Sequence, residues 1–342
     1  MMNAAFYTGH RRIEIRPTES ISPATGMAQV EVAYTGICGT DLHIVHGAMD
    51  ARVGPPAILG HEMAGHVAAV GDGVTDWQEG DPVTVMPLVW CGECAACRGG
   101  VPHICQRLSF LGIDAPGSLQ PRWTVPADTL VALPVDMSLR TAALAEPTAV
   151  AVHDVRRARL AAGQRAVVVG GGPIGLLVAA VAQETGADVL LVEPNDARRQ
   201  LADTVGLTTL DPRDREVATY FEEWTEGAGA EVSFEVSGAV AGIQTAIDAL
   251  GPRGRLVVVA IHATPPPVDL FRVFWRELTI VGARVYERPD FDHAVRLLAE
   301  GKIPVDALVT DVVPLAETAA AFEALDAGRA MKILVDCAGD AG

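Results

Sequence analysis

Residues 167–175 of the chain read VVVGGGPIG, and this stretch decides the fold of the second half of the sequence. It continues a short apolar run that starts at Ala166, and it leads into the apolar stretch 174–182, which is long enough for a buried helix. A strand that passes through a glycine-rich turn into a helix is typical of the first βαβ unit of a dinucleotide-binding domain. We therefore expect a nucleotide cofactor at this turn.

The glycines of this turn have separate tasks in that interpretation. Gly170 permits the tight turn, Gly172 lets a pyrophosphate approach the backbone, and Gly175 lets the helix pack closely on the strand. Pro173 and Ile174 fall at the start of the helix, where free N–H groups point toward the phosphates. These five residues form the cofactor-binding turn that we predict.

An acidic residue after the next apolar run indicates which cofactor is bound. The run 188–192 (DVLLV) ends just before Glu193, about 20 residues beyond the glycine turn. An acid at this position binds the adenosine ribose hydroxyls and repels the 2′-phosphate of NADP. Arg198 follows closely in the sequence, and its positive charge tempers that repulsion. We predict NAD, with Glu193 and Arg198 beside the ribose.

Around the glycine turn, apolar strand-like runs alternate with helical segments. Such alternation predicts a doubly wound parallel sheet that is covered by helices on both faces. The expected strands are 166–169, 188–192, 231–236, 255–260 and 277–282, and the expected helices are 174–182, 195–205 and 240–250.

The first part of the chain, from about Ala4 to Leu133, has a different pattern. Short strand-like runs such as 29–34 (QVEVAY), 66–70 (HVAAV) and 82–86 (PVTVM) are separated by turns rich in Gly and Pro. This pattern predicts a compact β barrel. A helix at 291–300 and a strand at 332–336 follow the nucleotide domain, and we expect this tail to return to the barrel.

Four of the six cysteines lie within fifteen residues, at Cys91, Cys94, Cys97 and Cys105. Thiolates at these spacings can fold around one tetrahedral zinc ion, with Zn–S bonds of about 2.3 Å. Because sulfur fills all four positions, no place remains for water or substrate. The quartet therefore predicts a structural zinc site.

A second set of residues offers mixed ligands. Cys38 lies in 36–43 (GICGTDLH), His61 and Glu62 lie in 60–65 (GHEMAG), and Glu146 precedes a proline. One thiolate, one imidazole and one carboxylate leave a coordination position open, as a catalytic zinc requires. Taken singly, each has an ordinary structural interpretation, for example Cys38 as a small core residue or His61 as a satisfied core histidine.

Together, the motifs at 36–43 and 60–65, the cysteine quartet and the glycine turn resemble those of the medium-chain, zinc-dependent alcohol dehydrogenases, over nearly the whole chain. The resemblance implies an α/β protein with a GroES-like β-barrel catalytic domain at 1–147 and 287–342, which carries both zinc sites. It implies a Rossmann NAD-binding domain at 148–286. It also implies that Cys38 and His61 bind the catalytic zinc, with Glu62 or Glu146 completing the ligand set.

Three further residues gain roles from the same resemblance. Asp41 is similar to the family's aspartate that accepts the free N–H of the zinc-bound histidine and fixes its tautomer. Thr40 offers a hydroxyl that can accept the substrate's proton and donate onward, and His43 can release that proton to solvent near neutral pH. We expect Thr40 and His43 to form the catalytic proton relay.

The segments 146–153 (EPTAVAVH), 192–194 (VEP) and 301–303 (GKI) look most like the 2,3-butanediol dehydrogenases, with the sorbitol dehydrogenases close behind. The segment 113–123 departs from both, so the resemblance implies only that a secondary alcohol or vicinal diol is oxidised. Two alternatives stay open: a catalytically silent, zinc-stabilised NAD-binding protein, and a zinc-free reductase of the same superfamily. Metal analysis combined with a panel of alcohols distinguishes them.

Composition sets the remaining expectations. With 342 residues, 49% of them hydrophobic, the chain can bury the cores of two domains, and its formal charge of −17 repels nucleic acid and anionic membrane surfaces. We find no secretory signal and no apolar run near the roughly 20 residues that span a bilayer, so we expect a cytoplasmic enzyme with a small-molecule substrate. Related enzymes pair an edge strand such as 277–282 across a two-fold axis, which implies a homodimer or homotetramer.

Overall fold

The computed structural model describes residues 2–213 and 217–338 and divides into two compact units. The first unit comprises Met1–Glu146, Glu287–Glu300 and Leu308–Gly342, and the second comprises Pro147–Tyr286 and Gly301–Ala307. The segment Gly301–Ala307 thus groups with the second unit, although it lies in the range expected for the catalytic domain.

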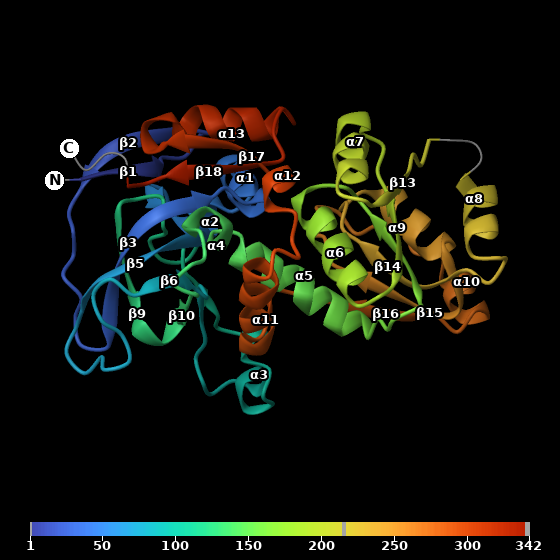
Figure 1. The fold of residues 1–342 in the computed structure, drawn as a ribbon, viewed down its shortest axis with the longest axis horizontal. Coiled ribbons are helices and arrows are strands. Elements are labelled where there is room, and N and C mark those ends of the chain that lie inside the picture. Colours follow the sequence, from blue (N-terminus) through green and yellow to red (C-terminus); the bar gives the residue numbers. More distant parts are fainter. Residues whose placement is uncertain (1, 214–216, 339–342) are drawn as a thin grey trace. The chain divides into compact units, whose positions relative to one another are not determined.

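The main sheet of the first unit follows the strand order β10-β6-β5-β3-β18-β17, and β9 also pairs with β3 (Figure 1). A smaller sheet has the order β2-β1-β4. The strand-like runs expected at 29–34 and 66–70 fall within β3 and β5, and the run 82–86 extends one residue beyond β6. The strands of the main sheet are β3 (Met27–Gly36), β5 (Glu62–Val70), β6 (Pro82–Val85), β9 (Arg122–Pro126), β10 (Leu130–Ala132), β17 (Val309–Pro314) and β18 (Lys332–Asp336).

Helices and short strands of the first unit surround this sheet. The small sheet contains β1 (Met2–Tyr7), β2 (Ile13–Thr18) and β4 (Ala57–Ile58), and a separate two-stranded sheet pairs β7 (Leu88–Val89) with β8 (Ser109–Phe110). The helices include α1 (Gly39–Val45), α2 (Asp50–Val53), α3 (Ala95–Arg98), α4 (Leu139–Ala142), α11 (Arg288–Ala299) and α13 (Thr318–Asp326).

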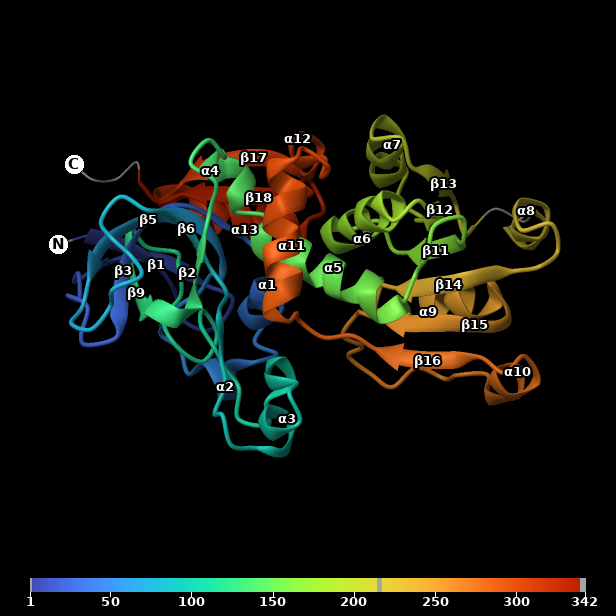
Figure 2. The ribbon, with the colours of Figure 1, turned by 60° about the horizontal axis from the view of Figure 1, so that its bottom comes forward.

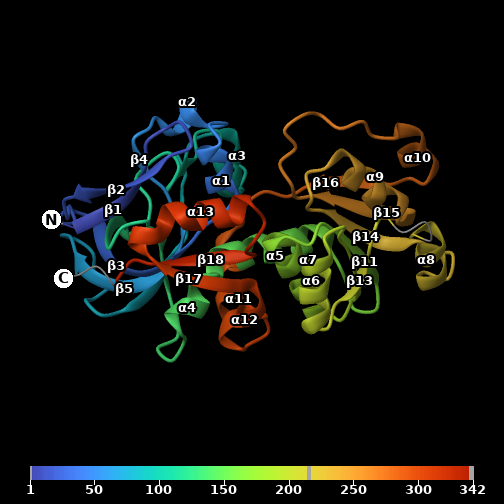
Figure 3. The ribbon, with the colours of Figure 1, turned by 90° about the horizontal axis from the view of Figure 1, so that it is seen from above.

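The C-terminal tail completes the first unit. Strand β18 pairs antiparallel with β3, with Leu334 opposite Gly36, and parallel with β17. Helix α13 lies along these tail strands (Figure 3). Two strands from near the end of the chain, β18 and β17, therefore extend one end of a sheet that is otherwise built from the first 135 residues.

The second unit is a parallel sheet with the order β13-β12-β11-β14-β15-β16 (Figure 2). Helix α6 packs on β11 and β12, and α9 packs on β11, β14 and β15 from the opposite face. The doubly wound sheet that the sequence predicts is confirmed. Its strands are β11 (Arg165–Val169), β12 (Asp188–Val192), β13 (Thr208–Leu210), β14 (Ala230–Glu235), β15 (Leu250–Val258) and β16 (Thr279–Gly282).

Helices α6 and α7 each begin after a short turn that follows an apolar strand: a glycine-rich turn after β11 and a polar turn after β12. The core-facing residues of the helices in this unit are buried, for example Leu176 and Leu177 in α6 and Ile243 and Ile247 in α9. None of the helices in the described part of the chain combines the length and hydropathy that crossing a membrane requires. The helices are α5 (Ala145–Ala158), α6 (Pro173–Glu184), α7 (Asp196–Thr204), α8 (Val217–Trp224), α9 (Val240–Asp248) and α10 (Leu270–Trp275), with α12 (Val305–Leu308) in the tail.

The topology fixes where a nucleotide can bind the second unit. Strands β12 and β13 extend from one side of β11, whereas β14, β15 and β16 extend from the other. The chain order reverses between β11 and β14, and open α/β sheets bind ligands outside the carboxyl ends of the strands at such a switch point. The glycine turn directly follows β11 and therefore lies at this point.

Candidate metal centres and nucleotide site

The cysteine quartet lies in the loop between β7 and β8, around the short helix α3. Neighbouring sulfurs are separated by 3.4 Å (Cys91 and Cys105), 3.5 Å (Cys94 and Cys97), 3.8 Å (Cys94 and Cys105) and 3.9 Å (Cys91 and Cys97). Zn–S bonds of about 2.3 Å at tetrahedral angles place sulfurs about 3.8 Å apart. The spacing of the sulfurs therefore fits one zinc ion. None of the cysteines in the described part of the chain forms a disulfide.

The thiols of the quartet differ in acidity in the protein without metal. A backbone hydrogen bond from Glu93 lowers the pKa of Cys91 to about 6, whereas burial raises the pKa of Cys97 to about 12. Thiolates packed this closely resist further ionisation unless a cation compensates their charge. A divalent metal ion would stabilise all four, which agrees with the tetrahedral spacing.

Cys38 is presented by a helix start that its own motif encodes. It is the N-cap of α1; its sulfur accepts from the backbone N–H of Thr40 at 3.5 Å, and its backbone N–H donates to Asp41 at 2.9 Å. This reciprocal pair is a capping box, with cysteine in place of the usual serine or threonine. N–H groups at a helix start favour the thiolate, which is the form that binds metal.

His61 and Glu62 lie next to Cys38 because of the pairing of β3 with β5. Glu62 stands opposite Gly36 in this pair, and a Cβ atom on Gly36 would lie only 2.3 Å from Oε2 of Glu62. One ligand atom each of Cys38, His61 and Glu62 lies within 4.8 Å of the other two. The structure thus brings together a thiolate, an imidazole and a carboxylate.

Several buried polar atoms of this cluster lack a hydrogen-bond partner among the described residues: Oδ1 of Asp41, Nδ1 of His61 and Oε1 of Glu62. Burial would lower the pKa of His61, but the carboxylate of Asp41 and the sulfur of Cys38 raise it well above the usual value. The cluster therefore stabilises positive charge at its centre, and its donor set fits a zinc ion. Asp41 Oδ1 lies 3.6 Å from Nδ1 of His61, too far for a hydrogen bond.

The second oxygen of Glu62 binds a residue that the sequence analysis missed. Lys332, at the start of β18, donates from Nζ to Glu62 Oε2 at 2.5 Å and to the carbonyl of Ile37 at 3.1 Å. Glu146 is also buried, and its charge contributes to the raised pKa of His61. Of the two glutamates, only Glu62 belongs to the described cluster of ligand atoms within 4.8 Å.

The two expected relay residues lie on α1. Thr40 and His43 are three residues apart and therefore neighbours on the helix surface. Thr40 is half-buried two residues after Cys38, and His43 is exposed to solvent in the last turn. The structure thus places both residues on one short helix that Cys38 caps.

The glycines of the nucleotide turn meet different surroundings. Gly170 has a φ of +109°, and a Cβ there would lie 2.9 Å from the backbone N of Ser237. Gly175 packs against the turn itself, since its Cβ would lie 1.8 Å from the carbonyl oxygen of Gly170. At Gly172, the N-cap of α6, nothing lies within 4 Å of a Cβ, and Pro173 follows at the first helical position. Gly172 therefore borders open space at the helix start, where a phosphate can approach.

Glu193 closes the other side of this turn. Its buried carboxylate accepts from the backbone N–H of Gly171 at 2.6 Å and of Asn195 at 2.7 Å. Nη1 of Arg198 lies 3.8 Å from Glu193 Oε2, and the Arg198 side chain is 39% exposed. The sequence predicted both residues at the ribose position, and the structure brings them together beside the glycine turn.

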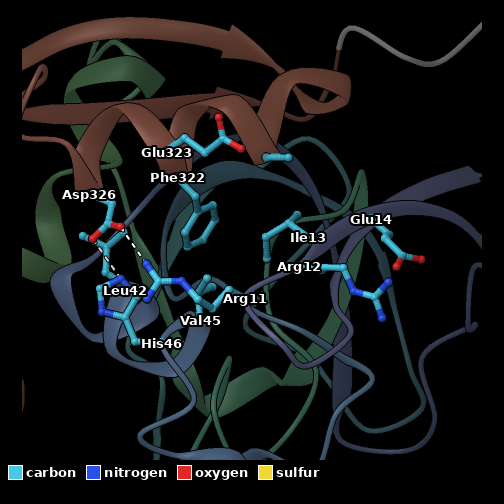
Figure 4. Close-up of a pocket in the computed structure, with 11 residues that line it drawn as sticks. Arg11, Arg12, Ile13, Glu14, Leu42, Val45, His46, Phe322, Glu323 and Asp326 are labelled. Carbon is cyan, nitrogen blue, oxygen red and sulfur yellow. Dashed lines mark hydrogen bonds and ion pairs between the residues drawn. The ribbon is translucent and has the colours of Figure 1, made fainter.

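A cavity of about 310 Å³ lies at the far end of α1 (Figure 4). Asp326 on α13 accepts from Arg11 at 3.0 Å and pairs with Nε2 of His46 at 2.8 Å, above an apolar floor that includes Val45 and Phe322. The residues that line this cavity include neither the candidate ligands nor Thr40. It is therefore a separate feature of the first unit.

Comparison with known proteins identifies the family. Residues 24–135 match the alcohol dehydrogenase GroES-like domain, and residues 173–300 match the zinc-binding dehydrogenase domain. The chain belongs to the medium-chain, zinc-binding alcohol dehydrogenase family and is a dehydrogenase. The family and the fold that the motifs predicted, a GroES-like domain with a Rossmann domain, are thus confirmed.

Three similar proteins cover almost the whole chain. It is 50% identical to 2-dehydro-3-deoxy-L-galactonate 5-dehydrogenase from Pseudoalteromonas atlantica, over 98% of this chain and 99% of that protein. It is 32% identical to sorbitol dehydrogenase from Halalkalibacterium halodurans, over 96% of each. The structure of 2R,3R-butanediol dehydrogenase from Bacillus subtilis is 31% identical and superposes with a TM-score of 0.89, over 98% of this chain and 99% of that one.

Proposed function

We propose that the protein is a zinc-dependent, NAD-linked dehydrogenase that oxidises a secondary hydroxyl group, flanked by other hydroxyls, to a ketone. The observation that carries this proposal is the cluster of Cys38, His61 and Glu62, with ligand atoms within 4.8 Å of one another. Glu62 is the proposed carboxylate ligand, and Glu146 acts on the cluster through its charge. The sulfur quartet holds a second, structural zinc.

The proposed reaction removes a proton and a hydride from the alcohol. The zinc ion, when bound, makes the substrate hydroxyl more acidic and polarises the product carbonyl. Thr40 accepts the hydroxyl proton, and His43 releases it to solvent. Asp41 orients His61 across 3.6 Å. The nicotinamide of NAD, when bound at the glycine turn, would supply the hydride acceptor. One alcohol and one NAD thus give one ketone, one NADH and one proton.

Among substrates, we propose that a deoxy sugar acid is preferred. The name of the Pseudoalteromonas relative specifies oxidation at carbon 5 of such an acid, which is a secondary carbon between two hydroxyl-bearing carbons. This chemistry agrees with the secondary alcohol or vicinal diol that the motifs imply. Sorbitol and 2,3-butanediol, the substrate types named for the other two relatives, are the neutral alternatives.

The deciding experiment measures NADH formation by the zinc-loaded protein with 2-dehydro-3-deoxy-L-galactonate, sorbitol and 2,3-butanediol. We expect the highest kcat/KM with the acid. A higher kcat/KM with sorbitol or 2,3-butanediol than with the acid would show that the protein is a dehydrogenase of neutral polyols or diols. No turnover of any of the three, with both zinc sites filled, would instead favour a catalytically silent NAD-binding protein.

We also propose that two copies associate through the second unit. Strand β16 is an edge of the parallel sheet, and the preceding α10 exposes Leu270, Phe271, Phe274 and Trp275, each at least 68%. An apolar surface beside an open strand edge supports pairing with a second copy. The resulting state is the homodimer, or the homotetramer built from it.

A further inference from the structure

Arg52 is held in a fixed orientation by a neighbouring carboxylate. It lies on α2, and it donates from Nε to Oδ1 and from Nη2 to Oδ2 of Asp114, both at 2.7 Å. Two parallel hydrogen bonds of this kind fix the plane of the guanidinium group. The Arg52 side chain remains 40% exposed, so the fixed group faces solvent on its other side.

Asp114 connects this arginine to the cluster of metal ligands. Its Oδ2 also accepts from the backbone N–H of Phe110 at 2.8 Å. The ring of Phe110 meets the ring of His61 edge-on, with centroids 5.2 Å apart. Two consecutive contacts therefore link the arginine's partner to a candidate zinc ligand.

The pairing with Asp114 leaves part of the guanidinium group unused. A guanidinium carries five N–H groups, of which Asp114 takes one on Nε and one on Nη2. Within the described part of the chain, Nη1 has no hydrogen-bond partner. The free edge formed by Nη1 and Nη2 has the geometry that binds a second carboxylate through two hydrogen bonds.

We propose that this free edge of Arg52 binds the carboxylate of the substrate acid and so determines the preference for a sugar acid over a neutral polyol. The inference rests on the proposed function, in which carbon 5 reacts and the carboxylate at carbon 1 lies four bonds away along the chain. Asp114 is the positioning residue, since it holds the guanidinium without using its outer edge. Arg11 is no substitute, because it lines the separate cavity of Figure 4.

The test compares Arg52→Gln and Arg52→Lys with Arg16→Gln as a matched control. Arg16 is 44% exposed, belongs to the same unit and pairs with Glu14 at 2.8 Å, but it lies on β2. Each variant receives 2-dehydro-3-deoxy-L-galactonate and its carboxamide, which has a similar shape and no charge. Zinc content and Tm are measured alongside kcat and KM.

We expect Arg52→Gln to raise KM for the acid at least tenfold, to change kcat less than threefold, and to leave KM for the amide unchanged. Lysine keeps the positive charge but cannot donate two parallel hydrogen bonds to a carboxylate, so Arg52→Lys should retain only part of the affinity for the acid. Arg16→Gln should behave as wild type. If Arg52→Gln folds poorly, Asp114→Asn offers a second test, because it weakens the paired hydrogen bonds that orient the guanidinium group. This variant should raise KM for the acid more than KM for the amide.

Two different failures can be told apart. If the wild type prefers the acid to the amide and Arg52→Gln keeps that preference with normal zinc and Tm, the assignment of Arg52 is wrong and the proposed function stands. If the wild type turns over the amide as well as the acid, carboxylate recognition by Arg52 is overturned and the proposed dehydrogenase activity stands. If the wild type turns over neither compound, the proposed sugar-acid substrate is wrong.

Discussion

Nζ of Lys332 lies 2.5 Å from Oε2 of Glu62, and both side chains are buried, with 3% and 1% exposed. The pair joins β18 to β5 across β3, so residues 270 positions apart meet beside Cys38. One carboxylate oxygen, Oε2, thus binds the ammonium group, while Oε1 has no hydrogen-bond partner among the described residues. The contact with Lys332 therefore fixes the orientation of the Glu62 carboxylate and leaves Oε1 as the oxygen that we propose for the metal.

Removing this ammonium group should destabilise the protein and weaken the catalytic metal site. Lys332→Met leaves a buried carboxylate without its partner, a change that typically costs about 3–5 kcal/mol. We expect a loss of that order in the free energy of unfolding, measured with urea, and loss of one of two zinc ions after dialysis. Adding Glu62→Gln should recover part of the stability but not the zinc. Unchanged zinc content in Lys332→Met would show that Lys332 does not position Glu62.

The two metal sites should respond differently to loss of one sulfur. Cys97→Ser removes a ligand from the quartet, whose loop depends on the metal for its structure, and we expect a clear drop in folded yield. Cys38→Ser should leave folding intact and abolish turnover, with one zinc retained. Metal analysis and circular dichroism measure both outcomes. A normal kcat in Cys38→Ser would show that Cys38 is not a ligand of the catalytic zinc.

The proton relay predicts a specific loss of rate. Thr40→Val keeps the shape of the side chain and removes the hydroxyl that accepts the substrate proton, and general acid–base steps contribute about 10²–10⁴-fold. We expect kcat to fall at least about a hundredfold, with zinc content and the Kd for NAD unchanged. Thr75→Val, at an exposed threonine, is the control. A fall of less than threefold in Thr40→Val would mean that the proton leaves by another route.

Glu193 should select NAD over NADP. Charge-assisted hydrogen bonds contribute about 1.5–3 kcal/mol, and the carboxylate also repels a 2′-phosphate. Glu193→Ala should therefore raise the Kd for NAD about tenfold or more and narrow the gap to NADP. The Glu193 carboxylate also accepts hydrogen bonds from the backbone N–H groups of Gly171 and Asn195. The variant Glu193→Gln keeps the size of the side chain and removes its charge, so it separates loss of the charge from loss of these backbone contacts. Equal binding of NADP and NAD by the wild type would contradict the assignment.

The apolar surface of α10 should control assembly. Trp275 is 71% exposed, and Trp275→Glu places a charge on the surface that we propose to be covered by a second copy. We expect light scattering to give the monomer mass for this variant and a multiple of it for the wild type. Ile21→Glu changes an apolar residue of the first unit that is also 71% exposed, and it should leave the mass unchanged. A monomeric wild type would reject the proposal.

Much of the fold follows from local patterns, and the differences have local causes. The run 188–192 coincides with β12 and 332–336 with β18, because apolar runs of this length form buried strands. Helix α5 was not predicted, since Pro147 reads as a boundary, although proline is well tolerated in the first turn of a helix. Strand β16 begins at Thr279 rather than at Glu277, whose φ of +50° ends the preceding turn.

The sequence by itself determined which chemical groups are available: four thiolates at metal-binding spacing, a mixed ligand set, a helix-capping Cys38, and a glycine turn with Glu193 after the next strand. Each of these signals is contained in a short segment or in two adjoining elements. Only the tertiary structure decided how distant segments combine. Strand register sets Glu62 opposite Gly36, β18 delivers Lys332 to it, and Asp114 aligns Arg52, because side-chain contacts between remote residues depend on packing that no local pattern records.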